Sequence, residues 1–307
     1  MKSTAELMKN ANKAGLVIPA FNVPYLPMIE PVVRAVVDQD CFALIESARL
    51  EWFKFGAISA AAVIAEYQRW ENPDHVRIHL DHVPVIDEDN VRVDYLATIR
   101  EALDLGYQSV MVDGSRLALE DNIEATRQVA ELAHQAGVPC EAELGAVLGH
   151  EAGPLPPYEE LFESGRGFTD IDEARRFVQE SGCDWLSVAV GNIHGAVADG
   201  LRDQKKPEAR LHLDHLDKLH QATGRPLVLH GGSGVKQEYL LAAIKKGISK
   251  VNVGTEIRQA YDSALSESRS EAEIPAAQEA VYERTCWLLR DYFGLAGTRR
   301  QIVEGAA

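Results

Sequence analysis

Short runs of apolar, often β-branched residues recur eight times along the chain, and longer stretches with helical periodicity separate them. The runs lie at residues 16–22, 42–47, 76–81, 109–114, 140–145, 185–191, 226–231 and 250–254. Between them, segments such as 93–106, 118–137 and 237–247 repeat apolar residues at helical spacing and end in glycine, which favours a helix C-cap. This alternation predicts strands that are buried on both faces and joined by helices, as in a parallel sheet.

Eight strand–helix units in 307 residues predict an α/β fold, the (β/α)8 or TIM barrel. A doubly wound sheet is the alternative, but no GxGxxG sequence follows the first apolar run. No domain boundary is evident, so we predict a single barrel domain over residues 1–307. Its C-terminal part, from about residue 260 to 307, is predicted to be an extra helical segment.

The composition indicates which binding partners and which cellular location to expect. With 47 acidic and 31 basic residues the formal net charge is −16, which argues against nucleic acids and anionic membranes as partners. The four cysteines form no CxxC pair and are expected to be reduced thiols. Because we find no signal-peptide pattern and no apolar run approaching ~18 residues, we expect a cytoplasmic protein.

Every predicted strand ends in a polar or ionisable residue, which burial alone would not select. These residues are Asn22, Ser47, Asp81 with His82, Asp113, Glu143, His194, His230 and Asn252. Because the carboxyl ends of barrel strands converge on one rim, residues far apart in sequence can meet there. Three imidazoles, His82, His194 and His230, together with the Glu143 carboxylate predict a zinc site at this rim.

The last two strand ends carry a second signal, for an anion. The sequence HGGSG at 230–234 offers backbone N–H groups that can form an anion-binding nest. The sequence VNVGTE at 251–256 leads a strand into a helix N-terminus, where Thr255 and free amides suit a phosphate. Loops after strands seven and eight are the usual phosphate site of these barrels.

A metal beside a phosphate site indicates a phosphorylated carbonyl substrate. Zinc can polarise a ketone and stabilise the enediolate left when a carbon–carbon bond breaks. Such a reaction also needs a proton carrier at the oxygen and a base at the α-carbon. We assign the first role to Asp81 and the second to Glu151, in the loop after the fifth strand.

The tetrapeptide HLDH occurs twice, at 79–82 and at 212–215. In the first copy strand alternation predicts that Asp81 and His82 diverge at the rim, while His79 packs or supports the site from within the strand. The second copy lies among leucines at helical spacing and before Gly224, so we place it on an outer helix away from the site.

The sequence also resembles the class II, zinc-dependent ketose-bisphosphate aldolases, which include fructose- and tagatose-bisphosphate aldolases. The stretches that carry this resemblance are AFNV (20–23), HLDH (79–82), SVMVDGS (109–115), EAELG (141–145), VGNIHG (190–195), HGGSG (230–234) and KVNVGTE (250–256). They stand in the family's order and cover residues 15 to about 260.

The resemblance implies a lyase that reversibly cleaves a phosphorylated ketose to dihydroxyacetone phosphate and an aldehyde. It implies Zn²⁺ on His82, His194 and His230, Glu143 as a neighbouring or exchangeable ligand, and Asp113 as a carboxylate close to the metal. A second divalent ion or a monovalent cation such as Na⁺ or K⁺ is a further option. Substrate and phosphate would contact Asn22, Ser47, Gly195, Gly231, Ser233, Asn252 and Thr255. The predicted C-terminal helix at 282–294 has an aromatic and leucine face that needs a partner, and we expect a homodimer or homotetramer.

This chain departs from the family at the segment DPRK, whose arginine reaches a distal phosphate; SESRSEAE stands in that region, with Arg269 as an approximate counterpart. The substrate therefore stays open, and a sulfonated or deoxy ketose phosphate is an alternative. Arg49 and Lys54 either receive a different substrate tail or are simply solvated. Two other classes are a metal-dependent hydrolase or isomerase barrel and a non-catalytic partner subunit.

Overall fold

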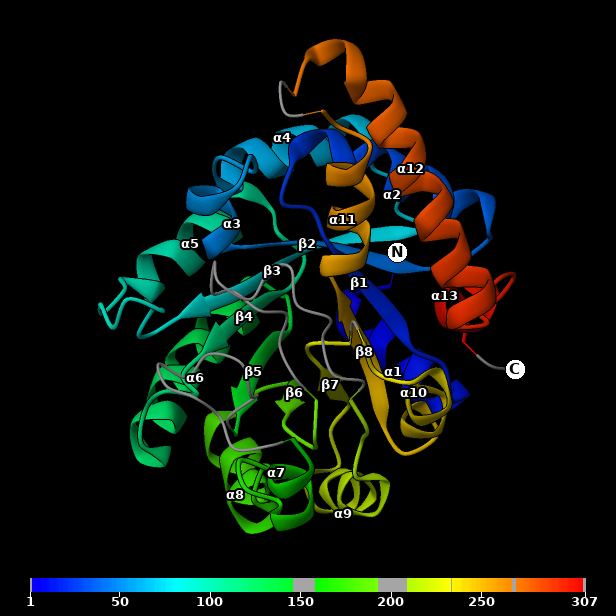
Figure 1. The fold of residues 1–307 in the computed structure, drawn as a ribbon. Helices are drawn as coiled ribbons and strands as arrows, with labels where there is room; N and C mark the ends of the chain where they lie inside the picture. Colours follow the sequence, from blue (N-terminus) through cyan, green and yellow to red (C-terminus); the bar gives the residue numbers. More distant parts are fainter. Residues whose placement is uncertain (1, 146–157, 193–208, 233, 267–268, 306–307) are drawn as a thin grey trace.

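The computed structural model describes residues 2–145, 158–192, 209–232, 234–266 and 269–305. In this part of the chain eight parallel strands close into one barrel in sequence order (Figure 1). The strands are β1 (Ile18–Asn22), β2 (Ala43–Ala48), β3 (Val76–Pro84), β4 (Val110–Asp113), β5 (Cys140–Leu144), β6 (Trp185–Val188), β7 (Leu227–Leu229) and β8 (Ile248–Val253). The predicted barrel is confirmed, and each strand overlaps the apolar run that predicted it.

Helices surround the barrel on its outer face (Figure 1). They are α1 (Thr4–Ala14), α2 (Ile29–Asp38), α3 (Arg49–Lys54), α4 (Ala60–Trp70), α5 (Tyr95–Leu105), α6 (Leu119–Gln135), α7 (Tyr158–Ser164), α8 (Ile171–Ser181), α9 (Leu213–Thr223), α10 (Gln237–Ile244), α11 (Thr255–Ser263), α12 (Ile274–Trp287) and α13 (Arg299–Val303). The predicted glycine caps are present after α5 and α9, where Gly106 and Gly224 adopt left-handed conformations.

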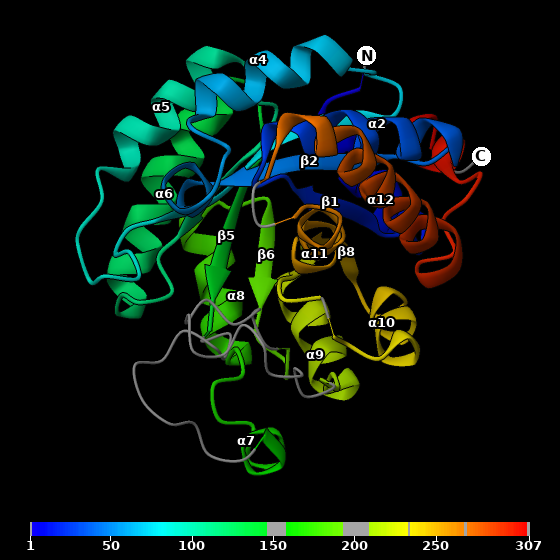
Figure 2. The same ribbon diagram turned by 45° about the horizontal axis from the view of Figure 1, so that its top comes forward.

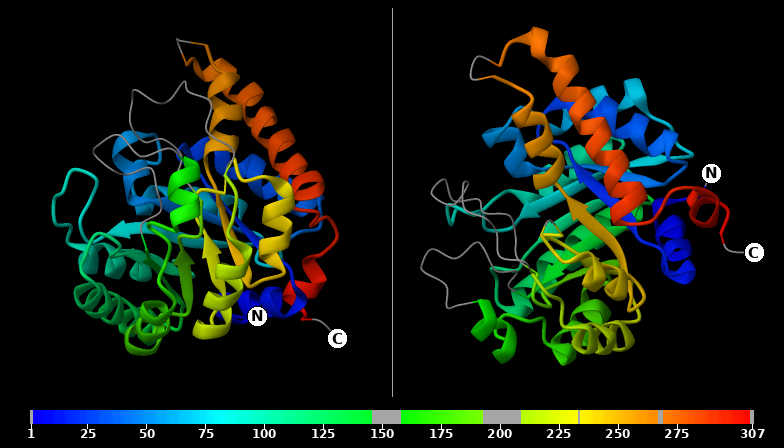
Figure 3. Two further views of the ribbon diagram at one scale, coloured as in Figure 1. Left: turned by 60° about the horizontal axis from the view of Figure 1, so that its bottom comes forward. Right: turned by 45° about the vertical axis from the view of Figure 1, so that its right-hand side comes forward.

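Both ends of the described chain lie at the amino-terminal end of the barrel. Helix α1 begins with a capping box between Ser3 and Glu6, and it buries Leu7 and Met8 against residues that fill this end of the barrel, such as Trp185. Helix α13 lies beside α1 (Figure 3), and Asn10 donates a 2.8 Å hydrogen bond to the carbonyl of Ile302. The chain therefore closes this end, and the opposite rim is left for the site.

The C-terminal helices form the predicted extra segment. Helix α12 packs along α2 and α11 (Figure 2) and continues into a π-helical turn at Leu288–Tyr292. Leu288 and Leu289 on this turn are buried within the same chain. Part of the apolar face that suggested an oligomer is thus covered within the chain, whereas Trp287 of the same face remains 37% exposed.

All four cysteines are buried free thiols, as predicted. Among the described helices we find none with the length and apolarity that crossing a bilayer requires.

Gly247, in the turn from α10 to β8, has no room for a side chain. Its φ of +105° is unfavourable for other residues, and an added Cβ would collide with the ring of His220. Gly224 also has a positive φ, of +59°, but nothing lies within 4 Å of an added Cβ. Replacement of Gly224 therefore tests backbone strain alone, whereas replacement of Gly247 tests backbone strain together with steric overlap.

We predict that Gly224→Ala lowers the free energy of unfolding by about 1 kcal/mol, the cost of a left-handed alanine. Gly247→Ala should cost about 3 kcal/mol, because overpacking adds to the backbone strain. Urea unfolding of both variants measures the difference. Equal losses would contradict the close packing of Gly247 against His220.

Candidate active site

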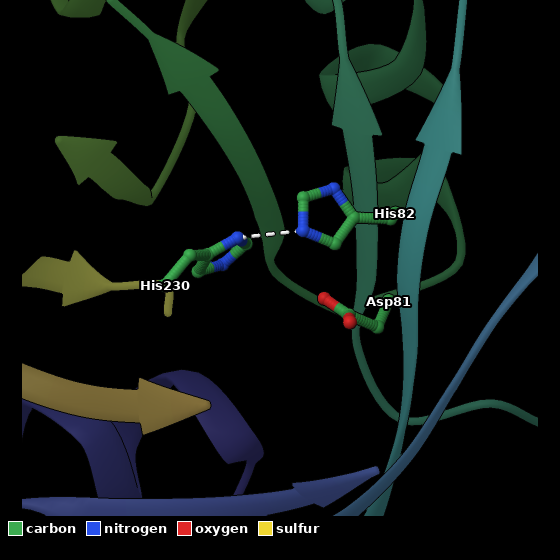
Figure 4. A group of neighbouring side chains, drawn as sticks. All are labelled: Asp81, His82 and His230. Carbon is green, nitrogen blue, oxygen red and sulfur yellow. Dashed lines mark hydrogen bonds between the residues drawn. The ribbon is translucent and has the colours of Figure 1, made fainter. Parts of the chain in front are cut away.

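A bulge in β3 brings two consecutive residues to the same centre. Leu80 pairs with Val110 of β4, but the next pair joins Val83 to Val112, so β3 holds one extra residue there. His82 has a φ of 30°, in the left-handed region, and this interrupts the alternation of side chains along the strand. Asp81, His82 and His230 consequently converge, with ligand atoms within 4.8 Å of one another (Figure 4). The prediction that Asp81 and His82 diverge is wrong for this reason.

The imidazoles of His82 and His230 face each other. Nδ1 of His230 lies 2.7 Å from Nε2 of His82 (Figure 4). The outer nitrogen of each ring is held by a carboxylate: His230 Nε2 lies 2.8 Å from Oε1 of Glu141, and His82 Nδ1 lies 3.5 Å from Oδ2 of Asp113. Oε2 of Glu143 lies 3.3 Å from His230 Nδ1. The inner nitrogens and Glu143 therefore share one small space.

These donor atoms fit a divalent metal of the zinc type. Two imidazole nitrogens and a carboxylate oxygen are the ligands that Zn²⁺ takes in proteins. Two facing nitrogens also need a proton or a cation between them, since their lone pairs otherwise repel. Burial alone would lower the pKa of His230, but Glu141 and Glu143 outweigh it and raise that pKa. The metal would therefore compete with a proton for this position.

Asp81 is held as a carboxylate beside the two histidines. Its side chain is buried, and each oxygen accepts one amide hydrogen bond: Oδ2 from Asn22 at 2.9 Å and Oδ1 from Asn252 at 3.0 Å. Burial would raise the pKa of Asp81, but the positive charges of His82 and Lys250 outweigh it, so the pKa is lowered. An ionised, oriented carboxylate at this place can accept a proton from a substrate hydroxyl.

A layer of charged residues that we did not predict lies inside the barrel beneath these groups. Lys250 of β8 pairs with Glu46 of β2 at 3.1 Å and with Glu141 of β5 at 2.9 Å, and all three are fully buried. His79 is also buried, bonds Ser109 at 2.8 Å and lies 3.5 Å from Glu141, which agrees with its predicted supporting role. The barrel core is therefore ionic on the side that supports the site.

Other predicted substrate contacts also lie at the carboxyl rim. Ser47 is buried and accepts a hydrogen bond from Trp52 Nε1 at 3.0 Å. Thr255 begins α11 directly after β8, as the phosphate prediction requires, and Gly231 has a φ of +66° after β7. Their contact with substrate stays a prediction.

Four predicted site residues, Glu151, His194, Gly195 and Ser233, lie outside the described residues. Near them, sequence reasoning missed Asn192, which is buried and donates a 2.9 Å hydrogen bond to the carbonyl of His230. It stands four residues after β6, where a polar side chain looks like ordinary loop composition.

Arg49 and Lys54 are engaged with the hairpin after β3. Arg49 lies 3.8 Å from Asp87 and Lys54 lies 3.2 Å from Glu88. Arg269, the approximate counterpart of the missing family arginine, bonds Asp262 at 2.8 Å. These basic groups are therefore partnered by acids of the same chain.

The second HLDH copy lies on the outside of the barrel, as predicted. His212 accepts a hydrogen bond from the backbone of His215 at the start of α9, and His215 lies 2.7 Å from the carbonyl of Thr169. Leu216 and Leu219 form the buried face of this helix.

Comparison with known proteins agrees with this geometry. The family model for fructose-bisphosphate aldolase class-II matches residues 2–297. Fructose-bisphosphate aldolase of Streptococcus pneumoniae serotype 4 is 33% identical over 288 residues, which covers 92% of this chain and 87% of that protein. The chain belongs to the class II fructose-bisphosphate aldolase family.

Relatives and solved structures extend the agreement. The fructose-bisphosphate aldolase of Streptococcus pyogenes serotype M3 is 33% identical over 287 residues, covering 92% of this chain and 87% of that protein. The YdjI aldolase from Escherichia coli K12 aligns with a TM-score of 0.76 and 26% identity, covering 97% of this chain and all of that one. This chain is thus an aldolase, a carbon–carbon lyase, and the hydrolase and isomerase alternatives are not favoured.

His79 should make the free energy of unfolding of the metal-free protein depend on pH. Burial and the charge of Lys250 lower the pKa of His79 from 6.5 to about 3. Between pH 6.5 and about 3, His79 is protonated in the unfolded chain but neutral in the folded chain. The free energy of unfolding therefore falls as the pH falls through this range.

We predict that His79→Gln removes this contribution, which is about 1.4 kcal/mol per pH unit within the window from pH 6 toward 3. Urea unfolding at several pH values, with chelator present, measures the slope. The same replacement at the exposed His134 controls for the loss of a histidine. An unchanged slope in His79→Gln would contradict a neutral, buried His79.

Proposed function

We propose that this aldolase is metal-dependent and cleaves a phosphorylated ketose to dihydroxyacetone phosphate and an aldehyde. One observation carries the proposal: the facing nitrogens of His82 and His230, with Glu143 beside them, stand next to the oriented carboxylate of Asp81. We infer that His194 completes the metal site with His82, His230 and Glu143, from the position it takes in the family pattern. A divalent ion bound there would polarise the substrate carbonyl and stabilise the negative charge that C–C cleavage leaves behind.

The chain's own groups would handle the protons. Asp81, with its oxygens fixed by Asn22 and Asn252, would take the proton from the substrate hydroxyl as the carbon–carbon bond breaks. Glu151 is proposed to return a proton to the α-carbon of the triose phosphate. In the reverse direction each group would do the opposite.

A Schiff-base route through the barrel's buried lysine is disfavoured by its surroundings. Lys250 is fully buried and lies between two carboxylates. Burial would lower the pKa of Lys250, but Glu141 and Glu46 outweigh it and raise that pKa, so the amine stays protonated. A protonated amine cannot attack a carbonyl.

For the phosphate we propose the ends of β7 and β8. The helix N-terminus at Thr255 supplies free backbone N–H groups and a positive dipole end, and the sequence HGGSG, which contains Gly231 and Ser233, follows β7. The absent DPRK segment leaves the distal end of the substrate open, so the enzyme would accept a ketose phosphate whose far end is not necessarily phosphorylated. We further propose a homo-oligomer acting in the cytoplasm.

The proposed activity is tested by a screen for triose phosphate release. The panel contains fructose and tagatose bisphosphates and singly phosphorylated, deoxy and sulfonated ketose phosphates. We expect release from at least one of them, lost with chelator and not trapped by borohydride. Release from none of them would overturn the proposal.

We predict that Asp81→Ala lowers the rate of cleavage by about 10²–10⁴-fold, the usual cost of losing a proton carrier. Bound metal should be retained, because His82, His230 and Glu143 are unchanged. Asp214→Ala, at the same place in the second HLDH copy, is the matched control and should keep wild-type activity. Near-normal turnover in Asp81→Ala would remove this residue from the mechanism.

A further inference from the structure

Glu141 connects the buried layer beneath the site to His230, one of the two proposed metal-binding histidines. Its two oxygens point to different partners: Oε1 lies 2.8 Å from His230 Nε2, and Oε2 lies 2.9 Å from Lys250 Nζ. Glu46 also pairs with Lys250, at 3.1 Å, and its neighbour in the register of β2 with β3 is His79 rather than His82. Glu46 and Glu141 are both fully buried.

The contact with Glu141 determines which nitrogen of His230 faces the site. An ionised carboxylate only accepts hydrogen bonds, and Glu141 is paired as a carboxylate with the ammonium of Lys250, which lies 2.9 Å from its Oε2. His230 must therefore carry its proton on Nε2, toward Glu141. In the neutral ring, the form that metal binding requires, Nδ1 then has its lone pair directed at His82 and Glu143.

We propose that Glu141, clamped from behind by Lys250, is a positioning residue that fixes the ring orientation and tautomer of His230 for metal binding. This inference rests on the metal site proposed above. A carboxylate behind a ligating histidine generally raises the affinity for the metal, because the ring needs no reorganisation when the ion binds. The ammonium of Lys250 cannot itself ligate a cation, so its effect on the orientation of His230 passes through Glu141.

The carboxylate contact to His82 is weaker than the one to His230. Asp113 lies 3.5 Å from His82 Nδ1, whereas Glu141 approaches His230 to 2.8 Å. Asp113 is also at the rim and partly exposed, while Glu141 is fully buried. The ring of His230 is therefore held more closely than the ring of His82, and Glu141 should matter more than Asp113 for metal affinity.

Glu141→Gln tests the inference, with Glu46→Gln as its matched control. An amide has only one acceptor oxygen, so the side chain introduced by Glu141→Gln cannot serve His230 and Lys250 together. We expect Glu141→Gln to weaken Co²⁺ and Zn²⁺ binding by about 10–100-fold, measured by chelator competition, and to change the visible absorption of bound Co²⁺. Glu46→Gln removes a carboxylate from the same lysine but should leave both readouts near wild type.

A double variant distinguishes positioning from general damage. In Glu141→Gln with Lys250→Met no ammonium competes for the amide oxygen, so the amide can again accept a hydrogen bond from His230. We expect metal affinity to recover part of the loss seen in Glu141→Gln. If the residues served only stability, the double variant would bind metal no better than the single one, and this result would overturn the inference.

Wild-type binding separates this inference from the proposed function. A wild-type chain that binds neither ion would sink the metal site itself. Wild-type binding with equal affinity in Glu141→Gln would leave the metal site standing and overturn only the role of Glu141. If Glu141→Gln does not fold, a triple variant that adds Lys250→Met and Glu46→Gln, and so leaves none of these three buried groups charged, is compared with Glu46→Gln instead. An affinity equal to that control would also overturn the inference.

Discussion

The inner nitrogens of His82 and His230 face each other because carboxylates occupy their outer nitrogens. Glu141 holds one ring and Asp113 the other. The site depends on this constraint, since imidazoles free to rotate could satisfy their hydrogen bonds elsewhere. Glu143 and Asp81 lie beside the space between these two nitrogens, and the set of donor atoms suits a divalent cation. The proposed metal site and the proposed proton carrier therefore share one set of strand ends.

Glu141 is held in place by an ion pair inside the barrel. Three strands contribute the ions, Glu46 from β2, Glu141 from β5 and Lys250 from β8, and burying them is costly unless they remain paired. An apolar barrel core would avoid this cost but would leave Glu141 without its clamp. The ionic layer is thus the support of the active rim, while α1 and the apolar cluster around Trp185 close the other end.

Much of this was predictable from sequence. Strand positions followed from apolar runs, and polar residues at strand ends identified His82, His230, Glu143 and Asp113, since the barrel brings such ends together. The ionic layer also left a signal. Glu141 and Lys250 each stand two residues before a rim residue, Glu143 and Asn252, and period-two spacing puts both members of each pair on one face of the strand.

Other features could not be predicted from the sequence. The bulge at His82 depends on how β3 registers against β4, which no local pattern encodes, so alternation misplaced Asp81 relative to His82. The partners of Arg49 and Lys54 depend on where the hairpin after β3 folds back. Likewise, part of the apolar C-terminal face is covered by α2, which lies far away in sequence.

The central claim is that one divalent ion held by the histidine pair makes this aldolase active. Titrating zinc into the chelator-stripped protein while following triose phosphate release tests it most directly. The account predicts that activity returns in proportion to added zinc and saturates at one ion per chain. It also predicts no recovery in His82→Ala and full recovery in His215→Ala, its counterpart on α9. Full activity before any zinc is added, or equal recovery in both variants, would contradict the account.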